Sequence, residues 1–304
     1  MLELDFAFFN MRSSNRQGLA NRKPILDRLA PLLFSPRVER LINFGRLGLK
    51  GCNLNLPLGQ SNWDILNNDN RDLMLARTSA ILEDYALPRM GVDRRLKNVF
   101  TAEEHDLSLI FGDCFLSVLA AVLIDQTVSR HDIKKLVLVG DVPYLWPLIR
   151  TVSSHNLPIS LQNCCPKRYE IMIHRLLYEE GLAVSNSCII PQRWGKGDLV
   201  LSVEPHSARI VLASPHIFHI RLDDESSGAA PELEQVLHEA GLDPHMYNLA
   251  PILESCLLAQ AGKSSQGGES NYLDAEFIPT DFYGEMMDTG HHLGMWELFL
   301  DKAG

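Results

Sequence analysis

The segment LVLVGDVPYLWPLIRT, from Leu136 to Thr151, decides the fold of this chain. Its first four residues are all apolar, as in a strand that is buried on both faces, and Gly140 then marks a turn. Pro143 suits the first position of a helix, where the N–H would be unpaired in any case, so we predict a helix over residues 143–155. A buried strand, a tight turn and a helix are typical of the start of a parallel α/β sheet.

Strands and helices continue to alternate after this segment. A helix is predicted over residues 166–181, and four further strands are predicted over residues 158–162, 187–190, 198–203 and 208–213. Strands that are joined by helical crossovers form a parallel sheet with right-handed connections. We therefore predict a Rossmann-like α/β domain over residues 131–222.

The amino-terminal residues predict another α/β domain, over residues 1–104. Apolar spacing and breaker residues give its elements in chain order: a strand over 2–9, a helix over 24–44, a strand over 51–57, a helix over 70–85 capped by Asp69, and a breaker cluster over 88–93. Alternating strands and helices again indicate an α/β arrangement.

The remaining residues connect and complete these domains. Residues 102–130 are apolar around most of a helical circumference, with an irregularity at Gly112, so we expect a buried connecting helix over 105–130. Residues 223–304 predict an acidic helical carboxy-terminal region, with helices over 231–240 and 244–261. This region should pack back on the body because its end is rich in large apolar residues: Phe282, Tyr283, Met286, Met287, Met295, Trp296, Leu298 and Phe299.

The charge distribution bears on partners and location. Residues 1–100 carry 15 Lys and Arg against 10 Asp and Glu, and residues 101–304 carry 13 against 28, which together give the net charge of −10. Basic residues gather only at Arg89, Arg94, Arg95 and Lys97, which favours a solvated face over a nucleic-acid surface. Neither a membrane span nor a secretory signal is indicated. We expect a cytoplasmic protein without nucleic-acid or membrane partners, and oligomer formation is open.

The turn after the first strand lacks the features that bind a dinucleotide. A G-x-G-x-x-G turn uses small residues and free N–H groups to hold a pyrophosphate at a helix start, and only Gly140 is present here. Asp141 adds negative charge, Val142 and Tyr144 add bulk, and Pro143 removes a donor. A plain structural turn is favoured over a cofactor cradle.

Four short segments resemble the shikimate dehydrogenase and glutamyl-tRNA reductase group. ISLQNCCPKRYEIM, residues 159–172, resembles the NRTxxRAExL segment of that group, with Asn163, Lys167, Arg168 and Glu170 at matching places. DLVLSVEP, residues 198–205, resembles DIVINATP, and GCNLNLP, residues 51–57, resembles GxNVTIP. The fourth is the turn itself. The resemblance covers residues 1–222 and implies a two-domain fold in which the Asn-Arg pair holds the 2′-phosphate of NADP.

The same segments depart from the family at its working positions. Cys164 replaces the Arg of the Asn-Arg pair, and Leu58 and Gly59 replace the His-Lys that carries proton transfer in the family. Val203 and Glu204 stand where the family has the Thr of ATP. The resemblance therefore implies a diverged shikimate-dehydrogenase-like protein, without the parent activity and with NADP disfavoured as its cofactor.

Our functional prediction is that a small molecule or a nucleotide binds in the inter-domain cleft. The predicted binding residues lie at the carboxyl ends of the strands, where such sheets bind ligands: Gly140, Asp141, Asn163, Lys167, Arg168 and Val203. The catalytic residues and the ligand stay unknown. One alternative is an NAD(P)-dependent oxidoreductase with an altered cofactor pose, for which His206 or a carboxy-terminal His would donate the proton. Another is an interaction protein that docks through its acidic carboxy-terminal region.

Two short segments contain residue types that bind metals. His216 and His219 would point to opposite faces of a strand, which disfavours a shared metal. Asp288, His291 and His292 have helical spacing for a shared ligand or an acid–base role, but Gly290 should interrupt that helix. We favour a capped turn there and predict no metal site. The six cysteines have no CxxC pair and are expected to be reduced and mostly buried, with Cys164 and Cys165 in a packing role.

Overall fold

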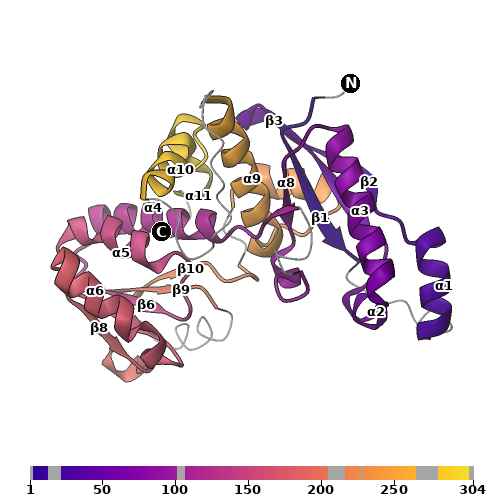
Figure 1. Cartoon of the computed structure of the whole chain (residues 1–304). Helices are drawn as coiled ribbons and strands as arrows, with labels where there is room; N and C mark the ends of the chain where they lie inside the picture. Colours follow the sequence, from indigo (N-terminus) through magenta and orange to yellow (C-terminus); the bar gives the residue numbers. More distant parts are fainter. Residues whose placement is uncertain are drawn as a thin grey trace. The chain divides into compact units, whose positions relative to one another are not determined.

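The computed structural model describes residues 3–12, 22–100, 107–204, 216–226, 229–264 and 280–300 (Figure 1). The chain forms two compact units, and each contains two separate stretches of sequence. The first unit comprises Met1–Gly112 and Pro231–Glu276, and the second comprises Asp113–Ala230 and Phe277–Gly304. The predicted carboxy-terminal region is thereby shared between the two units.

The first unit is built on a five-stranded sheet in the order β2-β3-β1-β4-β5. Its strands β1, β3, β4 and β5 are parallel, and β2 pairs antiparallel with β3. The strands are β1 (Phe6–Met11), β2 (Arg37–Phe44), β3 (Leu49–Leu56), β4 (Arg89–Val92) and β5 (Ser108–Ile110). Its helices are α1 (Lys23–Leu33), α2 (Gln60–Ile65), α3 (Asn68–Asp84), α8 (Pro231–Glu239) and α9 (Met246–Ser264), with short 3-10 turns η2 (Gly45–Leu47) and η3 (Arg94–Leu96).

The two faces of this sheet differ in chemistry. Side chains alternate along a strand, and those of one face form an apolar core with α1 and α3 that includes Phe9, Leu54 and Val92. The opposite face, which carries Asn53, packs against α8 and α9. Gly91 lies on this second face, where a Cβ would come within 2.9 Å of the Pro251 carbonyl oxygen in α9. A glycine is needed there because the helix backbone approaches the strand closely.

The second unit has the strand order of a Rossmann fold. Its sheet runs β10-β9-β6-β7-β8, and every neighbouring pair is parallel. Counted from β6 this is the order 3-2-1-4-5, with a switch point between β6 and β9. The strands are β6 (Lys135–Val139), β7 (Ile159–Gln162), β8 (Val184–Ser187), β9 (Asp198–Ser202) and β10 (Phe218–Arg221). The prediction of a Rossmann-like α/β fold is confirmed.

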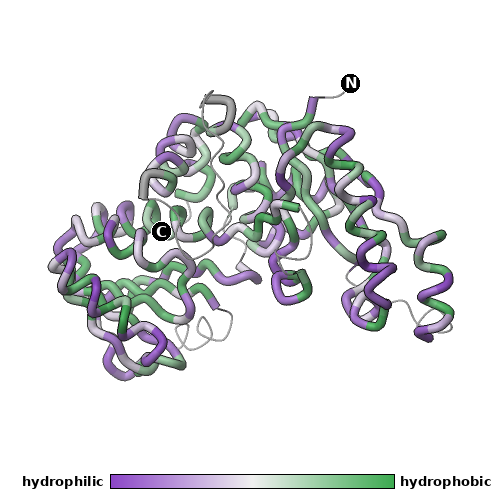
Figure 2. Tube along the Cα trace, in the orientation of Figure 1, coloured by the Kyte–Doolittle hydropathy of each residue, from purple (hydrophilic) through white to green (hydrophobic). Residues whose placement is uncertain are grey.

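The helices of the second unit pack on its sheet and on one another. They are α4 (Asp113–Arg130), α5 (Leu145–Val152), α6 (Glu170–Glu180), α10 (Thr280–His292) and α11 (Glu297–Leu300), with 3-10 turns η4 (Ser153–His155), η5 (Pro166–Tyr169) and η6 (Pro191–Arg193). Figure 2 shows mainly hydrophobic residues along the strands between them. Such uninterrupted apolar strands are typical of a parallel sheet that is covered on both faces.

The end of the chain packs on the second unit, as predicted. The Phe115 ring of α4 lies 5.6 Å from Trp296 and 5.8 Å from Phe299, measured between ring centroids. The Tyr283 hydroxyl donates to the Ser117 carbonyl oxygen at 2.9 Å. Gly290 does not interrupt α10, contrary to the prediction. Gly290 is buried within the helix, against Trp296. A Cβ at this position would lie 2.2 Å from the indole, so a glycine is needed for this close packing.

Two predicted helices begin or end elsewhere. The helix predicted over 24–44 ends at Leu33, and β2 follows, because Pro36 cannot continue a helix and restricts the residue before it. The connecting helix predicted over 105–130 begins at Asp113, after β5. Gly112 adopts a φ of +79° with Ala250 packed where a Cβ would be, so the chain turns there.

Smaller differences have local causes. The side chain of Asn67, not that of Asp69, accepts the N-terminal N–H of α3, from Asn70. The breaker cluster over 88–93 contains β4, since its glycine serves close packing and not a turn. The strand predicted over 187–190 lies at Val184–Ser187, and the one predicted over 208–213 is outside the described residues. Among the described residues no helix is long and apolar enough to cross a membrane.

Candidate functional site

The predicted binding residues of the second unit gather at one edge of its sheet. Val139 pairs with Gln162 of β7 and with Ser202 of β9, so the residues that follow these three positions leave the sheet side by side. These are Gly140, Asn163 and Val203. The edge lies at the switch point, where sheets of this order bind their ligands.

The turn after β6 is occupied by a carboxylate of the protein itself. The Asp141 N–H donates to Oε1 of Glu204 at 2.9 Å. Gly140 has a φ of +96°, and a Cβ there would come within 3.0 Å of the Glu204 side chain. Gly140 is thus required both for its backbone conformation and for the close approach of Glu204. The amide that would face a phosphate in this type of turn already has an anionic partner.

The Asp141 side chain binds the cationic segment that follows β7. Arg168 donates from Nη1 to one carboxylate oxygen at 2.8 Å, and the Tyr169 hydroxyl donates to the other at 2.8 Å. Burial, and then the hydrogen bond to Asp141, raise the pKa of the Tyr169 phenol above its ordinary value. Arg168 and Asp141 are both more than half exposed, so this pair orders the turn more than it stabilises the fold.

Asn163 is the most buried of the predicted binding residues. Only 1% of it is exposed, and its Oδ1 accepts the Cys165 N–H at 2.8 Å. That bond identifies the other amide atom as Nδ2, which has no hydrogen-bond partner among the described residues. A buried donor without an acceptor costs free energy, so a ligand acceptor placed there would be stabilised. Lys167 is exposed and Val203 is half-buried.

Other sequence expectations for this edge need correction. α5 begins at Leu145, and its N-cap is Tyr144 with a φ of +47°, so Pro143 is not the first helical residue. Cys164 and Cys165 are exposed because they follow the end of β7, so they have no packing role. Cys188 is also exposed, and the other three of the six cysteines are buried. His206 is outside the described residues.

His216 and His219 lie in different surroundings and do not share a metal site in the described structure. His216 is exposed and precedes β10, whereas His219 Nε2 lies 2.7 Å from Ser202 Oγ. Burial, and then Arg221, lower the pKa of His219 to about 4. Asp288, His291 and His292 are exposed on α10. The described part of the chain contains no group of three or more His, Cys, Asp or Glu side chains that could hold a metal ion.

The first unit contains a polar cluster that was not predicted from the sequence. It lies at the carboxyl ends of β1, β3 and β4, on the face toward α8 and α9, and comprises Asn10, Asn53, Asn55, Asp93, Arg95, Asp243, Tyr247 and Asn248. Asn10 and Asn55 are paired neighbours on adjacent strands. Four buried amide oxygens in this cluster, of Asn10, Asn53, Asn55 and Asn248, have no hydrogen-bond partner among the described residues.

An ion pair completes this polar cluster. Asp93 is 2% exposed and accepts three hydrogen bonds from the Arg95 side chain, the shortest at 2.6 Å. The Arg95 guanidinium lies 3.8 Å from the centre of the Tyr247 ring, and the Tyr247 hydroxyl donates to Asp243 at 2.8 Å. The signal in the sequence was the asparagines of GCNLNLP, since buried strands rarely hold unpaired amides.

Comparison with known proteins adds little to this geometry. No family model matches the chain, and no curated protein matches it. Among solved structures, the chain is similar to L-tryptophan dehydrogenase from Nostoc punctiforme, with 11% identity and a TM-score of 0.41, over 99% of this chain and 86% of that chain. The fold of the second unit rests on its own strand order and pairing.

Proposed function

We propose that the second unit binds a small molecule or a nucleotide that makes no diphosphate contact at the turn after β6. The observation that carries this proposal is the Glu204 carboxylate on the Asp141 N–H. A phosphate oxygen would need the same N–H and would meet a negative charge there. NADP in the ordinary pose, and with it the parent dehydrogenase activity, is disfavoured.

The basic residue that remains after β7, where Cys164 replaces the arginine of the family's Asn-Arg pair, supports the same proposal. Arg168 is paired with Asp141, so a phosphate would have to compete with that carboxylate. A group that lacks a hydrogen-bond partner among the described residues is the buried Nδ2 of Asn163, which is a neutral donor. A neutral acceptor, such as a ring nitrogen or a hydroxyl of an adenosine-like nucleoside, would satisfy it.

Calorimetric titration of the full chain with adenosine, AMP, NADP(H) and NAD(H) tests this proposal. We expect adenosine to bind at least as tightly as either dinucleotide, because the added phosphates gain no partner. Asn163→Asp keeps the acceptor for the Cys165 N–H and removes the donor, so it should weaken adenosine binding, whereas Asn156→Asp on the exposed surface should not. Dinucleotide binding much tighter than adenosine binding would overturn the proposal.

A second candidate is an NAD(P)-dependent oxidoreductase with an altered cofactor pose. The polar cluster of the first unit favours it, because the buried Asp93 carboxylate, the exposed Arg95 guanidinium and the buried amide oxygens without a protein partner are groups that orient a polar substrate. A cofactor response that Arg168→Ala abolishes would support this candidate, provided that Arg175→Ala, at an exposed arginine of α6, leaves it unchanged. No response to any dinucleotide would exclude it.

A further inference from the structure

The four unpaired amide oxygens of the polar cluster in the first unit point to a bound ligand. Asn53 and Asn248 are 1% and 3% exposed, and Asn10 and Asn55 are half-buried. The Oδ1 atom of each is buried and has no hydrogen-bond partner among the described residues. A buried acceptor without a donor costs free energy, so four of them in one cluster are disfavoured unless a bound group donates to them.

The orientation of three of these amides is fixed by their nitrogen atoms. Each Nδ2 donates to an oxygen of the protein: Asn53 to the Ala240 carbonyl at 3.3 Å, Asn248 to the Asp243 carbonyl at 2.9 Å, and Asn55 to the Glu39 carboxylate. A flipped amide would lose its bond and set two acceptors against each other. The oxygen is therefore the unpaired end of each of these side chains.

Strand pairing brings three of the oxygens to one face of the sheet. Asn10 of β1 and Asn55 of β3 are partners in register, so their side chains point to the same face and lie one strand spacing apart, roughly 4.8 Å. Asn53 precedes Asn55 by two residues and shares this face, roughly 7 Å away along β3.

The chain before and at the start of α9 crosses the same end of the sheet. Ala240 accepts the Asn53 amide at β3, and Tyr247 lies against Arg95 of η3, directly after β4. β1 lies between β3 and β4, and the three strands span roughly 10 Å. Asn248, which follows Tyr247, therefore lies on the sheet side that carries the other three amides, and a small ligand can span the group.

The groups around these oxygens favour a ligand that donates hydrogen bonds. The Tyr247 hydroxyl donates to Asp243, and the Arg95 side chain donates to Asp93, so these donors are already engaged. A ligand carboxylate or phosphate would add acceptors to a cluster that already has too many. An ammonium group has three donors and no acceptor. Beside α9, moreover, the two carboxylates Asp93 and Asp243 stand against the single cation Arg95, which suits a positively charged ligand.

We propose that this polar cluster binds the ammonium group of a small primary amine. Two acceptors that each bind one N–H of an ammonium group at about 2.9 Å lie roughly 4.7 Å apart, which is the spacing of paired strands. Asn10 and Asn55 meet this condition, and a further amide oxygen accepts the third N–H. The inference names a ligand class for the cluster on which our second candidate function rests, but it holds whether or not the second unit binds a cofactor.

Three small probes separate the hydrogen bonds of the ligand from its charge. Calorimetry on the full chain at constant ionic strength would compare methylammonium, tetramethylammonium, which has the charge but no N–H, and methanol, which has one donor and no charge. We expect methylammonium to bind at least about ten-fold more tightly than either of the others. Equal binding of tetramethylammonium or of methanol would overturn the ammonium assignment, and no binding of methylammonium would overturn the site.

Two substitutions of Asn10 change its oxygen in opposite ways. Asn10→Leu removes the acceptor at similar size, so it should weaken methylammonium binding by at least about ten-fold. Without the amine it should raise the melting temperature, because an unpaired buried oxygen is lost. Asn10→Asp supplies a charged acceptor and should tighten binding by at least about three-fold. Asn43→Leu, at an exposed asparagine of β2, should change the affinity by less than about two-fold.

The outcomes that would refute the proposal are distinct for the two variants. A folded Asn10→Leu variant with full methylammonium affinity would refute it, and so would a lower melting temperature of that variant without amine, since the oxygen would then have a partner in the protein. If the Leu variant does not fold, Asn10→Asp decides, because binding no tighter than that of the wild type would contradict the role of this acceptor. Neither variant should change adenosine binding, so the proposal for the second unit is tested separately.

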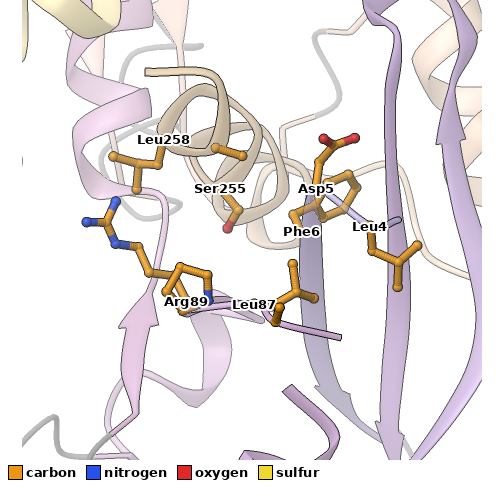
Figure 3. Close-up of a pocket in the computed structure, with 10 residues that line it drawn as sticks. Leu4, Asp5, Phe6, Leu87, Arg89, Ser255 and Leu258 are labelled. Atoms are coloured by element: carbon orange, nitrogen blue, oxygen red, sulfur yellow. The ribbon is translucent and has the colours of Figure 1, made fainter. Parts of the chain in front are cut away.

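A cavity elsewhere in the first unit provides a control for the location. It has a volume of about 340 Å³ and lies at the amino ends of β1 and β4, beside the second half of α9 (Figure 3). β1 has six residues, so the cavity lies roughly 20 Å from the polar cluster along that strand. Leu258→Trp fills the cavity and should leave the methylammonium affinity unchanged. Loss of binding in this variant would place the amine in the cavity and overturn the proposal.

Discussion

Replacement of Glu204 should open the turn after β6 to anions. The wild-type carboxylate accepts the Asp141 N–H at 2.9 Å, so a phosphate oxygen at that amide would take the same place. Glu204→Ala removes both the occupant and its charge. Glu204→Gln keeps a side chain of the same size that can accept the N–H, but removes the charge. We expect the affinity for NADP(H) and for pyrophosphate to rise in the order wild type, Gln variant, Ala variant.

The size of this effect follows from the charge separation. Two unit charges about 4 Å apart repel by about 1 kcal/mol in water and by about 4 kcal/mol at the effective dielectric of a protein surface. Glu204 is half-buried, so the gain should lie between these limits. In affinity this corresponds to roughly five-fold to several-hundred-fold.

The assay is calorimetric titration with pyrophosphate and NADP(H), at low and at high salt. Glu179→Ala, at an exposed carboxylate of α6, is the matched control, and it should leave both affinities unchanged. Because the effect is electrostatic, it should shrink at high salt. If neither Glu204 variant binds pyrophosphate more tightly than the wild type, the carboxylate does not close this turn and the reasoning is refuted.

Two further predictions concern stability. Gly290→Ala should lower the free energy of unfolding by about 1–3 kcal/mol, because its Cβ would clash with Trp296. Gly284→Ala, in open space on the same helix, should raise the free energy of unfolding by up to about 1 kcal/mol. Urea unfolding curves measure both effects, and equal effects would contradict the packing of Gly290 against Trp296. The pKa of His219 is lowered to about 4 by burial and by Arg221, so the unfolded chain binds its proton first as the pH falls. The wild type should lose about 1–2 kcal/mol between pH 6.5 and 4, after allowance for partial exposure, and His219→Gln should lose less over the same range; identical pH profiles would contradict this assignment.

The elements that the sequence predicted best are those with an uninterrupted local signal. The apolar run of β6 and the helices α8 and α9 were recovered to within a few residues, because burial and periodicity depend on the segment itself. Elements were misassigned where the local effect of Pro36 was missed or where a glycine had a tertiary role. Gly91 was read as part of a breaker cluster, although it lies in β4 because α9 packs against it.

The site residues show the same division. The absence of a glycine-rich turn at Gly140 and the positions of Asn163 and Arg168 could be read from the chain, because each follows directly from a predicted strand. That Glu204 occupies the Asp141 amide could not, since the two residues are far apart in sequence and meet only through the pairing of β6 with β9. The polar cluster was missed for the same reason: its members come from two strands, from the η3 turn after β4, and from α9 and the loop before it.

The sequence by itself determined that the chain contains a parallel α/β sheet and that its first turn lacks the residues of a dinucleotide site. Both depend on local properties, namely apolar periodicity and the size and charge of residues 140–144. Only the tertiary structure decided which groups fill that turn, and which polar and charged side chains meet in the first unit. Strand order and helix packing bring distant residues together, and neither is encoded in the spacing of a single segment.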